Sequence, residues 1–262
     1  MRDGLIGRPR GWRCRPCRRR CSSTASVSCF AWTNNGCRLP TPAHSTFDRA
    51  CSPPTRSVRV KPAERFLFVI FTFPFASYYS GPVDVLVTEQ YVRAFPGGTG
   101  DVKSAGNYAA SLLADQEARA AGFATVLWLD GRERRFIEEC GVMNVFFVLE
   151  DRVVTPSLSG TIIPGITRDS VITLLRDMRV EVEERRVSVQ EIIESHRVGR
   201  LRECFGTGTA ATVSHIKRLH YKGQDIALPP VASRKIGPLV HERLVAMVTG
   251  SIPDDHNWIE RV

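Results

Sequence analysis

The chain has 262 residues, of which 43% are hydrophobic, and a formal net charge of +9. This is enough apolar sequence for one large domain or two small ones. Residues 1–60 contain twelve arginines, no lysine and two acids, a net charge of +10, whereas the remainder contains 24 bases and 25 acids. The remainder therefore has no positive surplus for a phosphate backbone, which argues against a nucleic-acid partner.

No stretch of the sequence is long and apolar enough to predict a membrane-spanning helix. The most apolar segment, residues 66–79, contains Pro74 and is shorter than the about 20 residues that cross a bilayer. Its aromatic and β-branched residues favour a buried strand. We therefore expect no membrane partner. The later part of the sequence has a microbial character, so the expected location is the cytoplasm. A mitochondrial address is the alternative, because an Arg-rich, acid-poor start is typical of transit peptides.

Residues 1–63 form a predicted leader that is rich in arginine and cysteine and lacks apolar periodicity. Such a segment buries too little surface to offset the entropy of ordering, so we predict that it is disordered. Three cysteines between positions 14 and 21 have the close spacing of zinc ligands. The later cysteines supply no matching pair, and we predict no metal site. Residues 64–81 are predicted to be an inter-domain strand and linker, and residues 82–262 a large domain.

Strand-like and helix-like segments alternate through this large domain. Strands are predicted at 66–73, 83–87, 125–129, 144–149, 153–155 and 180–186, and helices at 107–121, 167–178, 189–195 and 236–248. We expect Ala110, Leu113 and Ala114 on the apolar side of the first helix, and Val171, Leu174 and Leu175 on that of the second. The mixture predicts a mixed α/β or α+β domain.

Two segments place charged side chains beside glycine turns. Residues 97–108 (GGTGDVKSAGNY) put Lys103 between a glycine-rich turn and a helix. A lysine amine that has lost its proton can form a Schiff base, although a lysine in such a loop is more often solvated. Glu138 and Glu139 lead into the turn at Gly141, and their pattern is typical of a surface edge. If they pointed inward they would need a cationic partner.

Two further segments could bind an anion. Residues 164–169 (PGITRD) begin a helix with Thr167 as the predicted N-cap, and residues 206–210 (GTGTA) are predicted to be a glycine–hydroxyl loop. Helix starts and such loops present N–H and O–H donors to an anion. Either one alone is more often a cap or a turn.

In order, GGTGDVKSAGNYAASLLA, EECGVMNVFFV, PGITRDSV and FGTGTAATVS closely resemble the branched-chain amino acid aminotransferases. These are class IV enzymes of fold type IV that use pyridoxal 5'-phosphate. The resemblance extends from about residue 66 to residue 262. It implies the large domain of such an enzyme, acting as a homodimer without a metal. The implied reaction is transamination of leucine, isoleucine or valine with 2-oxoglutarate, which gives branched 2-oxo acids and glutamate.

The resemblance also implies roles for single residues around the cofactor ring. Lys103 matches the family's Schiff-base lysine, which also moves the proton. Tyr108 matches a tyrosine near the 3′ oxygen of the cofactor. Glu139 matches the glutamate against the pyridine nitrogen, and Asn144 matches an asparagine close by.

The remaining correspondences concern phosphate and substrate. Ile166 and Thr167 fall on the family's phosphate-binding helix start, and Thr209 falls on its second phosphate-binding loop. Ala210 falls where a backbone N–H helps to hold the substrate carboxylate. Tyr78 matches an active-site tyrosine at the end of the inter-domain segment.

The resemblance implies a small N-terminal domain to which residues 1–63 show no similarity. One interpretation is that the start of the gene is assigned wrongly, so that out-of-frame sequence is read as protein. The other is a truncated relative, weakly active or non-catalytic. A third hypothesis is another class IV enzyme, such as a D-amino acid aminotransferase or an aminodeoxychorismate lyase. The GGTGDVK and GNY runs argue against that last hypothesis.

Overall fold

The computed structural model describes residues 44–52, 67–75 and 78–259. The chain divides into two units. Residues up to Tyr78 together with His256–Val262 form the first, and Tyr79–Asp255 form the second. The sequence-based boundary between linker and large domain, at residues 81 and 82, lies close to this division.

In the first unit, strands β1 (His44–Ser52) and β2 (Leu67–Phe75) form an antiparallel pair in which Ala50 is opposite Val69. Strand β2 confirms the strand predicted at 66–73. The prediction of disorder for the leader does not hold for β1. A strand forms by pairing, and the composition of residues 44–52 alone does not reveal that they pair with β2. The cysteines with zinc-like spacing lie outside the described residues.

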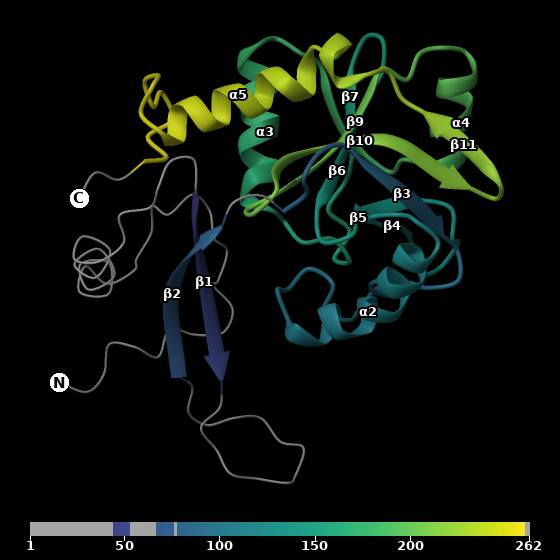
Figure 1. The fold of residues 1–262 in the computed structure, drawn as a ribbon, viewed down its shortest axis with the longest axis horizontal. Coiled ribbons are helices and arrows are strands. Elements are labelled where there is room, and N and C mark those ends of the chain that lie inside the picture. The colour runs from purple at the N-terminus through teal and green to yellow at the C-terminus, as the bar shows by residue number, and fades with distance from the viewer. Residues whose placement is uncertain (1–43, 53–66, 76–77, 260–262) are drawn as a thin grey trace, which may run out of the picture. The chain divides into compact units, whose positions relative to one another are not determined.

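The second unit is built on one mixed sheet of nine strands, which confirms the predicted mixed α/β class (Figure 1). Its strands run in the order β5-β4-β3-β10-β9-β6-β7-β8, and β11 pairs with β10. The pairs β3–β10, β3–β4 and β7–β8 are parallel, and the other pairs are antiparallel. The strands are β3 (Val83–Thr88), β4 (Thr125–Leu129), β5 (Ile137–Cys140), β6 (Asn144–Val148), β7 (Val153–Pro156), β8 (Val182–Arg185), β9 (Glu203–Gly208), β10 (Thr212–Tyr221) and β11 (Gln224–Ala227).

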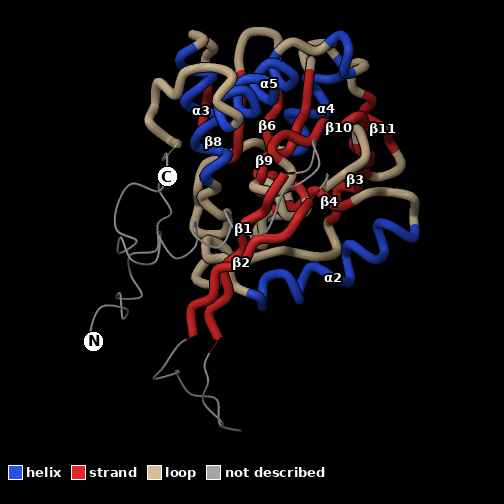
Figure 2. Tube along the Cα trace, turned by 60° about the vertical axis from the view of Figure 1, so that its left-hand side comes forward, coloured by secondary structure: helices blue, strands red, loops and turns tan. Residues whose placement is uncertain are grey.

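The helices of this unit confirm the four helices expected from the sequence. They are α2 (Ala105–Ala120), α3 (Ile166–Asp177), α4 (Val189–Arg197) and α5 (Ile236–Val248), with a short 3-10 turn at Val231–Ser233. Figure 2 shows α3 and α5 on one part of the sheet and α2 on another. Helices α3 and α5 contact each other and both pack on β9, whereas α2 packs on β3 and β4. None of the helices in the described ranges is long and apolar enough to cross a membrane.

Strand β4 is buried on both faces, which explains its uninterrupted apolar sequence TVLWL. Leu127 and Leu129 join the main core between the sheet and α4, whereas Val126 and Trp128 pack against α2. The Trp128 indole Nε1–H donates to the Gly141 carbonyl at 2.9 Å, so its one polar group is satisfied. This bond ties the core to the turn that follows β5.

Helix α2 does not bury the face that its sequence suggests. Its buried residues are Asn107, Ser111, Ala114 and Ala118, whereas Leu113 is 53% exposed and Ala110 is exposed. The prediction was therefore correct for Ala114 and wrong for Ala110 and Leu113. Small side chains on the buried face let the helix approach the large Trp128 ring closely, because packing responds to fit as well as to hydrophobicity. In α3, Val171, Leu174 and Leu175 are buried as predicted.

Candidate functional site

The candidate site lies where the turn between β5 and β6 meets the start of α3 and the end of β9. Gly141 turns the chain with a φ of +57°, and β6 then begins at Asn144, which is opposite Thr207 of β9. The Asn144 amide donates to the Ile163 carbonyl at 2.9 Å. Asn144 therefore joins three of the segments that the sequence analysis singled out.

Glu139 points into the protein from β5 and is 2% exposed. Its Oε1 accepts the Ile163 N–H at 2.7 Å, and its Oε2 lies 3.0 Å from the Arg93 Nε. Burial raises the pKa of this carboxyl to about 7, although Arg93 and the Ile163 N–H both act to lower it. Glu139 is thus an acid whose charge depends on its neighbours.

Glu138 is also buried, so the prediction that both acids form a surface edge was wrong. Its Oε1 accepts the Thr161 hydroxyl, and burial raises its pKa. Its Oε2 is buried without a hydrogen-bond partner among the described residues. Loop residues, Arg93 and Thr161 among them, cover this end of the sheet, which the local sequence of β5 does not show.

Arg93 is the cationic partner that inward-pointing acids require, and the sequence analysis did not identify it. Its guanidinium is buried, and Nη2 donates to the Gly100 carbonyl at 2.9 Å and to the Thr161 carbonyl. The sequence indicated a cationic partner only on the condition that the acids pointed inward. The choice among 36 basic residues was not evident, because Arg93 reaches Glu139 only through the fold.

The glycine-rich turn is held against α2 by Asn107. The Asn107 amide donates to the carbonyls of Thr99 at 2.6 Å and Val102 at 2.8 Å, and its Oδ1 accepts the Thr99 hydroxyl at 2.7 Å. Lys103 follows this fixed turn and lies two residues before α2, with its side chain exposed. The turn therefore fixes the backbone at Lys103 while the amine stays accessible.

Tyr108 and Glu139 line the same small cavity, together with Arg93, Val142 and Ile163. Its volume is about 10 Å³, which is space for about one water. The structure thus brings together two residues that the resemblance assigns to one ring. Lys103 does not line this cavity and lies on the exposed turn.

The helix start differs in detail from the prediction. The N-cap of α3 is Gly165 without a side-chain bond, and Thr167 lies inside the first turn, so the N-cap prediction for Thr167 was wrong. A Cβ at Gly165 would collide with the Asn144 side-chain oxygen, so any other residue at this cap would require Asn144 to move. The first N–H groups of a helix have no partner within the helix. Ile166 and Thr167 therefore offer backbone donors.

The second glycine–hydroxyl segment is only partly a loop. Gly206 and Thr207 belong to β9, and Thr209 and Ala210 form the turn before β10. Thr209 is exposed and Ala210 is half-buried. The Thr207 hydroxyl is buried and makes no hydrogen bond within the described part of the chain.

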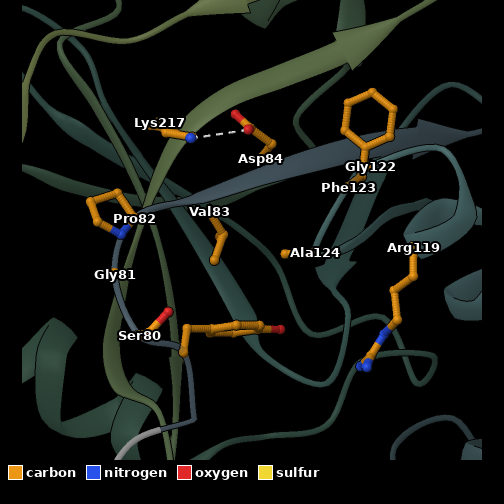
Figure 3. Close-up of a pocket in the computed structure, with 11 residues that line it drawn as sticks. Ser80, Gly81, Pro82, Val83, Asp84, Arg119, Gly122, Phe123, Ala124 and Lys217 are labelled. Carbon is orange, nitrogen blue, oxygen red and sulfur yellow. Dashed lines mark ion pairs between the residues drawn. The ribbon is translucent and has the colours of Figure 1, made fainter.

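Two other features complete the description of the candidate residues and cavities. Tyr78 belongs to the first unit and is exposed, and its role in the site remains a prediction. A wider hollow of about 450 Å³ is lined by residues 79–84, Arg119, residues 122–124 and Lys217 (Figure 3). Lys217 and Asp84, both in its lining, form an ion pair at 3.1 Å. It contains none of the predicted site residues, and we do not assign the site to it.

The mixed sheet matches the fold of the class IV aminotransferases, fold type IV. The chain belongs to the amino-transferase class IV family, which matches residues 47–219. The match begins within the segment that the sequence analysis treated as leader.

Among curated relatives, the chain is similar to the probable branched-chain-amino-acid aminotransferase of Staphylococcus aureus (strain N315). The two are 42% identical over 200 residues, which cover 75% of this chain and 56% of the relative. This chain is also 40% identical to branched-chain-amino-acid aminotransferase 2 of Bacillus subtilis (strain 168), over 78% of this chain and 57% of the relative. The chain therefore spans little more than half the length of these relatives.

Solved structures show the same fold. The branched-chain aminotransferase of Thermoproteus uzoniensis with norvaline superposes with a TM-score of 0.72 at 22% identity, over 82% of this chain and 68% of that one. The branched-chain amino acid aminotransferase of Thermobaculum terrenum, in its PLP-form, gives a TM-score of 0.64 at 22% identity. That superposition covers 83% of this chain and 68% of the Thermobaculum terrenum chain.

Proposed function

We propose that this chain carries the pyridoxal 5'-phosphate-binding domain of a branched-chain amino acid aminotransferase. The observation that carries the proposal is Glu139, a buried acid beside Tyr108, between the lysine turn and the start of α3. A buried acid is the group that can hold a proton on a pyridine nitrogen. Relatives at 40–42% identity with this named activity support the same assignment.

The donor set fits such a cofactor, although the cavity must widen to admit a ring. Glu139 would hold the pyridine nitrogen in its protonated form, and Tyr108 would face the 3′ oxygen. Asn144 would fix the turn around them through its bond to Ile163. When bound, the cofactor supplies a ring that accepts electrons from the substrate.

The start of α3 and the turn between β9 and β10 would bind the two anionic groups, the cofactor phosphate and the substrate carboxylate. Backbone N–H groups at Ile166 and Thr167 would bind the phosphate from the start of α3, where the helix dipole favours negative charge. Thr209 would contribute from the turn between β9 and β10. Ala210 would donate its N–H to the substrate carboxylate, and Tyr78 would lie near the substrate.

The exposed Lys103 would move the proton at the substrate Cα, because a lysine amine can act as a nucleophile and as a general acid–base. The substrates would be leucine, isoleucine or valine and 2-oxoglutarate, and the products branched 2-oxo acids and glutamate. We further propose that the enzyme acts as a homodimer in the cytoplasm. We propose a boundary near residues 78–82 for the start of the cofactor-binding domain, in line with the division at Tyr78 and Tyr79.

The test is a titration of the purified chain with pyridoxal 5'-phosphate, followed by visible absorption and by quenching of protein fluorescence. We expect the wild type to show the absorption of covalently bound cofactor, and Lys103→Ala to lose that absorption. Lys217→Ala is the matched control, because Lys217 is an exposed lysine in the separate hollow. A wild type that neither absorbs nor quenches would contradict the proposal.

The substrate class needs a second experiment. Cofactor-loaded protein would be mixed with leucine, D-alanine or aminodeoxychorismate, and the change in the cofactor's absorption recorded for each. We expect leucine to convert the cofactor and the other two to leave it unchanged. Conversion by D-alanine alone would move the assignment to a D-amino acid aminotransferase.

A further inference from the structure

One buried side chain, Arg93, touches three separate parts of the candidate site. Its Nη2 donates to the Gly100 carbonyl in the lysine turn and to the Thr161 carbonyl in the segment that leads to α3. Its Nε lies 3.0 Å from Glu139 on β5. Arg93 is 7% exposed, so these contacts are made away from water, where charged interactions are stronger.

The backbone segments that Arg93 contacts are packed closely against each other at Gly100. A Cβ at Gly100 would lie 2.5 Å from the Ala94 Cβ and 2.6 Å from the Thr161 carbonyl oxygen. Only glycine lets the lysine turn approach the Thr161 segment this closely. The two carbonyls that Arg93 bonds are therefore brought together by a residue that has no side chain, and Arg93 satisfies both.

The charges in this cluster do not balance by themselves. Glu138 and Glu139 are both buried, and among the described residues the ion pair found for these two acids is that of Glu139 with Arg93. The Arg93 Nε–H also lacks an aligned hydrogen-bond acceptor, although it lies close to Glu139. Two buried acids with one cation are costly to ionise together. A protonated pyridine nitrogen would be the second cation.

We propose that Arg93 is a positioning residue of this site, which favours the ionised form of Glu139 and directs it toward the pyridine nitrogen while it ties the lysine turn to the segment before α3. The inference rests on the proposed function and names a residue that acts through Glu139. Arg93 supplies a positive charge beside Glu139 and two hydrogen bonds to backbone carbonyls at once. Its planar guanidinium holds these contacts in a fixed geometry, which the flexible lysine side chain reproduces only in part.

A purely structural arginine is the alternative, and the chain contains one for comparison. Arg234 is also 7% exposed, and its guanidinium donates to the carbonyls of Pro229 at 2.9 Å, Cys204 at 3.3 Å and Ile216 at 2.8 Å. It thus resembles Arg93 in burial and in bonding backbone carbonyls, but it lies outside the candidate site. Arg234→Gln is therefore the matched control.

The first measurement uses the full chain without cofactor. The titration of the Glu139 carboxyl is followed by carbon NMR of selectively labelled glutamate, with Glu139→Gln to assign the signal. The groups facing it are Glu138 on the same strand, Arg93, and Tyr108 from α2. We expect Arg93→Gln to raise the midpoint by at least about one pH unit, Arg93→Lys to raise it less, and Arg234→Gln to leave it unchanged. An unchanged midpoint in Arg93→Gln would overturn the proposal.

The second measurement is the affinity for pyridoxal 5'-phosphate, from fluorescence quenching. We expect Arg93→Gln to bind at least about tenfold more weakly than the wild type, which corresponds to about 1.4 kcal/mol. Arg93→Lys should recover part of this loss, and Arg234→Gln should bind within about twofold of the wild type. Equal weakening by Arg93→Gln and Arg234→Gln would assign Arg93 a structural role instead. If Arg93→Gln does not fold, Arg93→Lys carries both measurements.

The two measurements separate this inference from the proposed function. A wild type that does not bind the cofactor refutes the function, whereas the carboxyl titration still decides whether Arg93 sets the charge of Glu139. A wild type that binds, with Arg93→Gln binding equally well, refutes the role of Arg93 and leaves the function standing.

Discussion

Two opposed effects act on the pKa of the Glu139 carboxyl. Burial favours the neutral acid, whereas Arg93 and the Ile163 N–H favour the carboxylate, and burial is the larger effect. The neighbouring Glu138 adds to the preference for the neutral form. A residue in this balance can change its charge when a cation arrives beside it, which is the behaviour that a pyridine partner requires.

This balance predicts how the stability of the cofactor-free chain depends on pH. The folded-state pKa of Glu139, about 7, lies above its ordinary value of 4.5. The folded state therefore binds more protons than the unfolded state between these values, and stability falls as pH rises through this window. We expect the free energy of unfolding to fall by about 2–3 kcal/mol from pH 5 to pH 8 through this group.

Chemical denaturation of the wild type and of Glu139→Gln at both pH values measures this contribution. The difference between the two proteins isolates Glu139, because other titrating groups are present in both. His215 is one of these, and burial lowers its pKa, so it acts in the opposite direction. If Glu139→Gln gained no stability relative to the wild type between pH 5 and pH 8, the folded-state pKa of Glu139 would not be raised.

At the scale of helices, replacing each of two helical glycines by alanine should change the stability in opposite directions. Gly106 lies in the first turn of α2, and a Cβ there would meet only the Ser104 hydroxyl oxygen, at 3.7 Å. Gly237 lies in the first turn of α5, and a Cβ there would lie 2.9 Å from the His215 ring and 3.1 Å from Glu203. Glu203 itself accepts three backbone N–H groups at this helix start, including that of Gly237 at 2.7 Å.

We therefore expect Gly106→Ala to stabilise the protein by about 0.5–1 kcal/mol, because alanine loses less entropy in a helix. Gly237→Ala should destabilise it by about 1–3 kcal/mol, because the methyl group overpacks a site that cannot expand freely. Thermal unfolding of the two variants beside the wild type measures both. Stabilisation by Gly237→Ala would show that the His215 side chain moves aside without cost.

The elements that could be predicted are those whose signal is local. Helix α5 begins and ends where its sequence pattern indicates, and β4 does as well. The errors occur where a distant partner decides. Leu113 is exposed because α2 packs its small residues on Trp128, and Thr167 loses the N-cap to Gly165 because Asn144 lies against that glycine. The local sequence of each helix does not show which distant residues will pack against it.

The same distinction applies to the site. Glu139 and Tyr108 could be named from motifs, and they share a cavity. Arg93 could not be named, because it reaches Glu139 from a loop 46 residues away in sequence. The available signal was conditional: the two acids would need a cation if they pointed inward, and the sequence did not indicate which one.

At the scale of the whole chain, the cofactor would join segments that are far apart in sequence. The lysine turn, β5, the start of α3 and the turn after β9 each provide one part of the proposed site. A ligand that binds the folded state and not the unfolded state stabilises the former by RT ln(1 + [L]/Kd). At a concentration one hundred times Kd this amounts to about 2.7 kcal/mol.

We therefore expect pyridoxal 5'-phosphate at that excess to raise the free energy of unfolding of the wild type by about 2.7 kcal/mol, measured by denaturant unfolding. Lys103→Ala should gain less at the same concentration, because it keeps the charged contacts and loses the covalent bond. Lys217→Ala, in the separate hollow, should gain as much as the wild type. A cofactor that absorbs as a covalent adduct but leaves the unfolding transition unchanged would place its attachment on a surface lysine instead of in a site that depends on the fold.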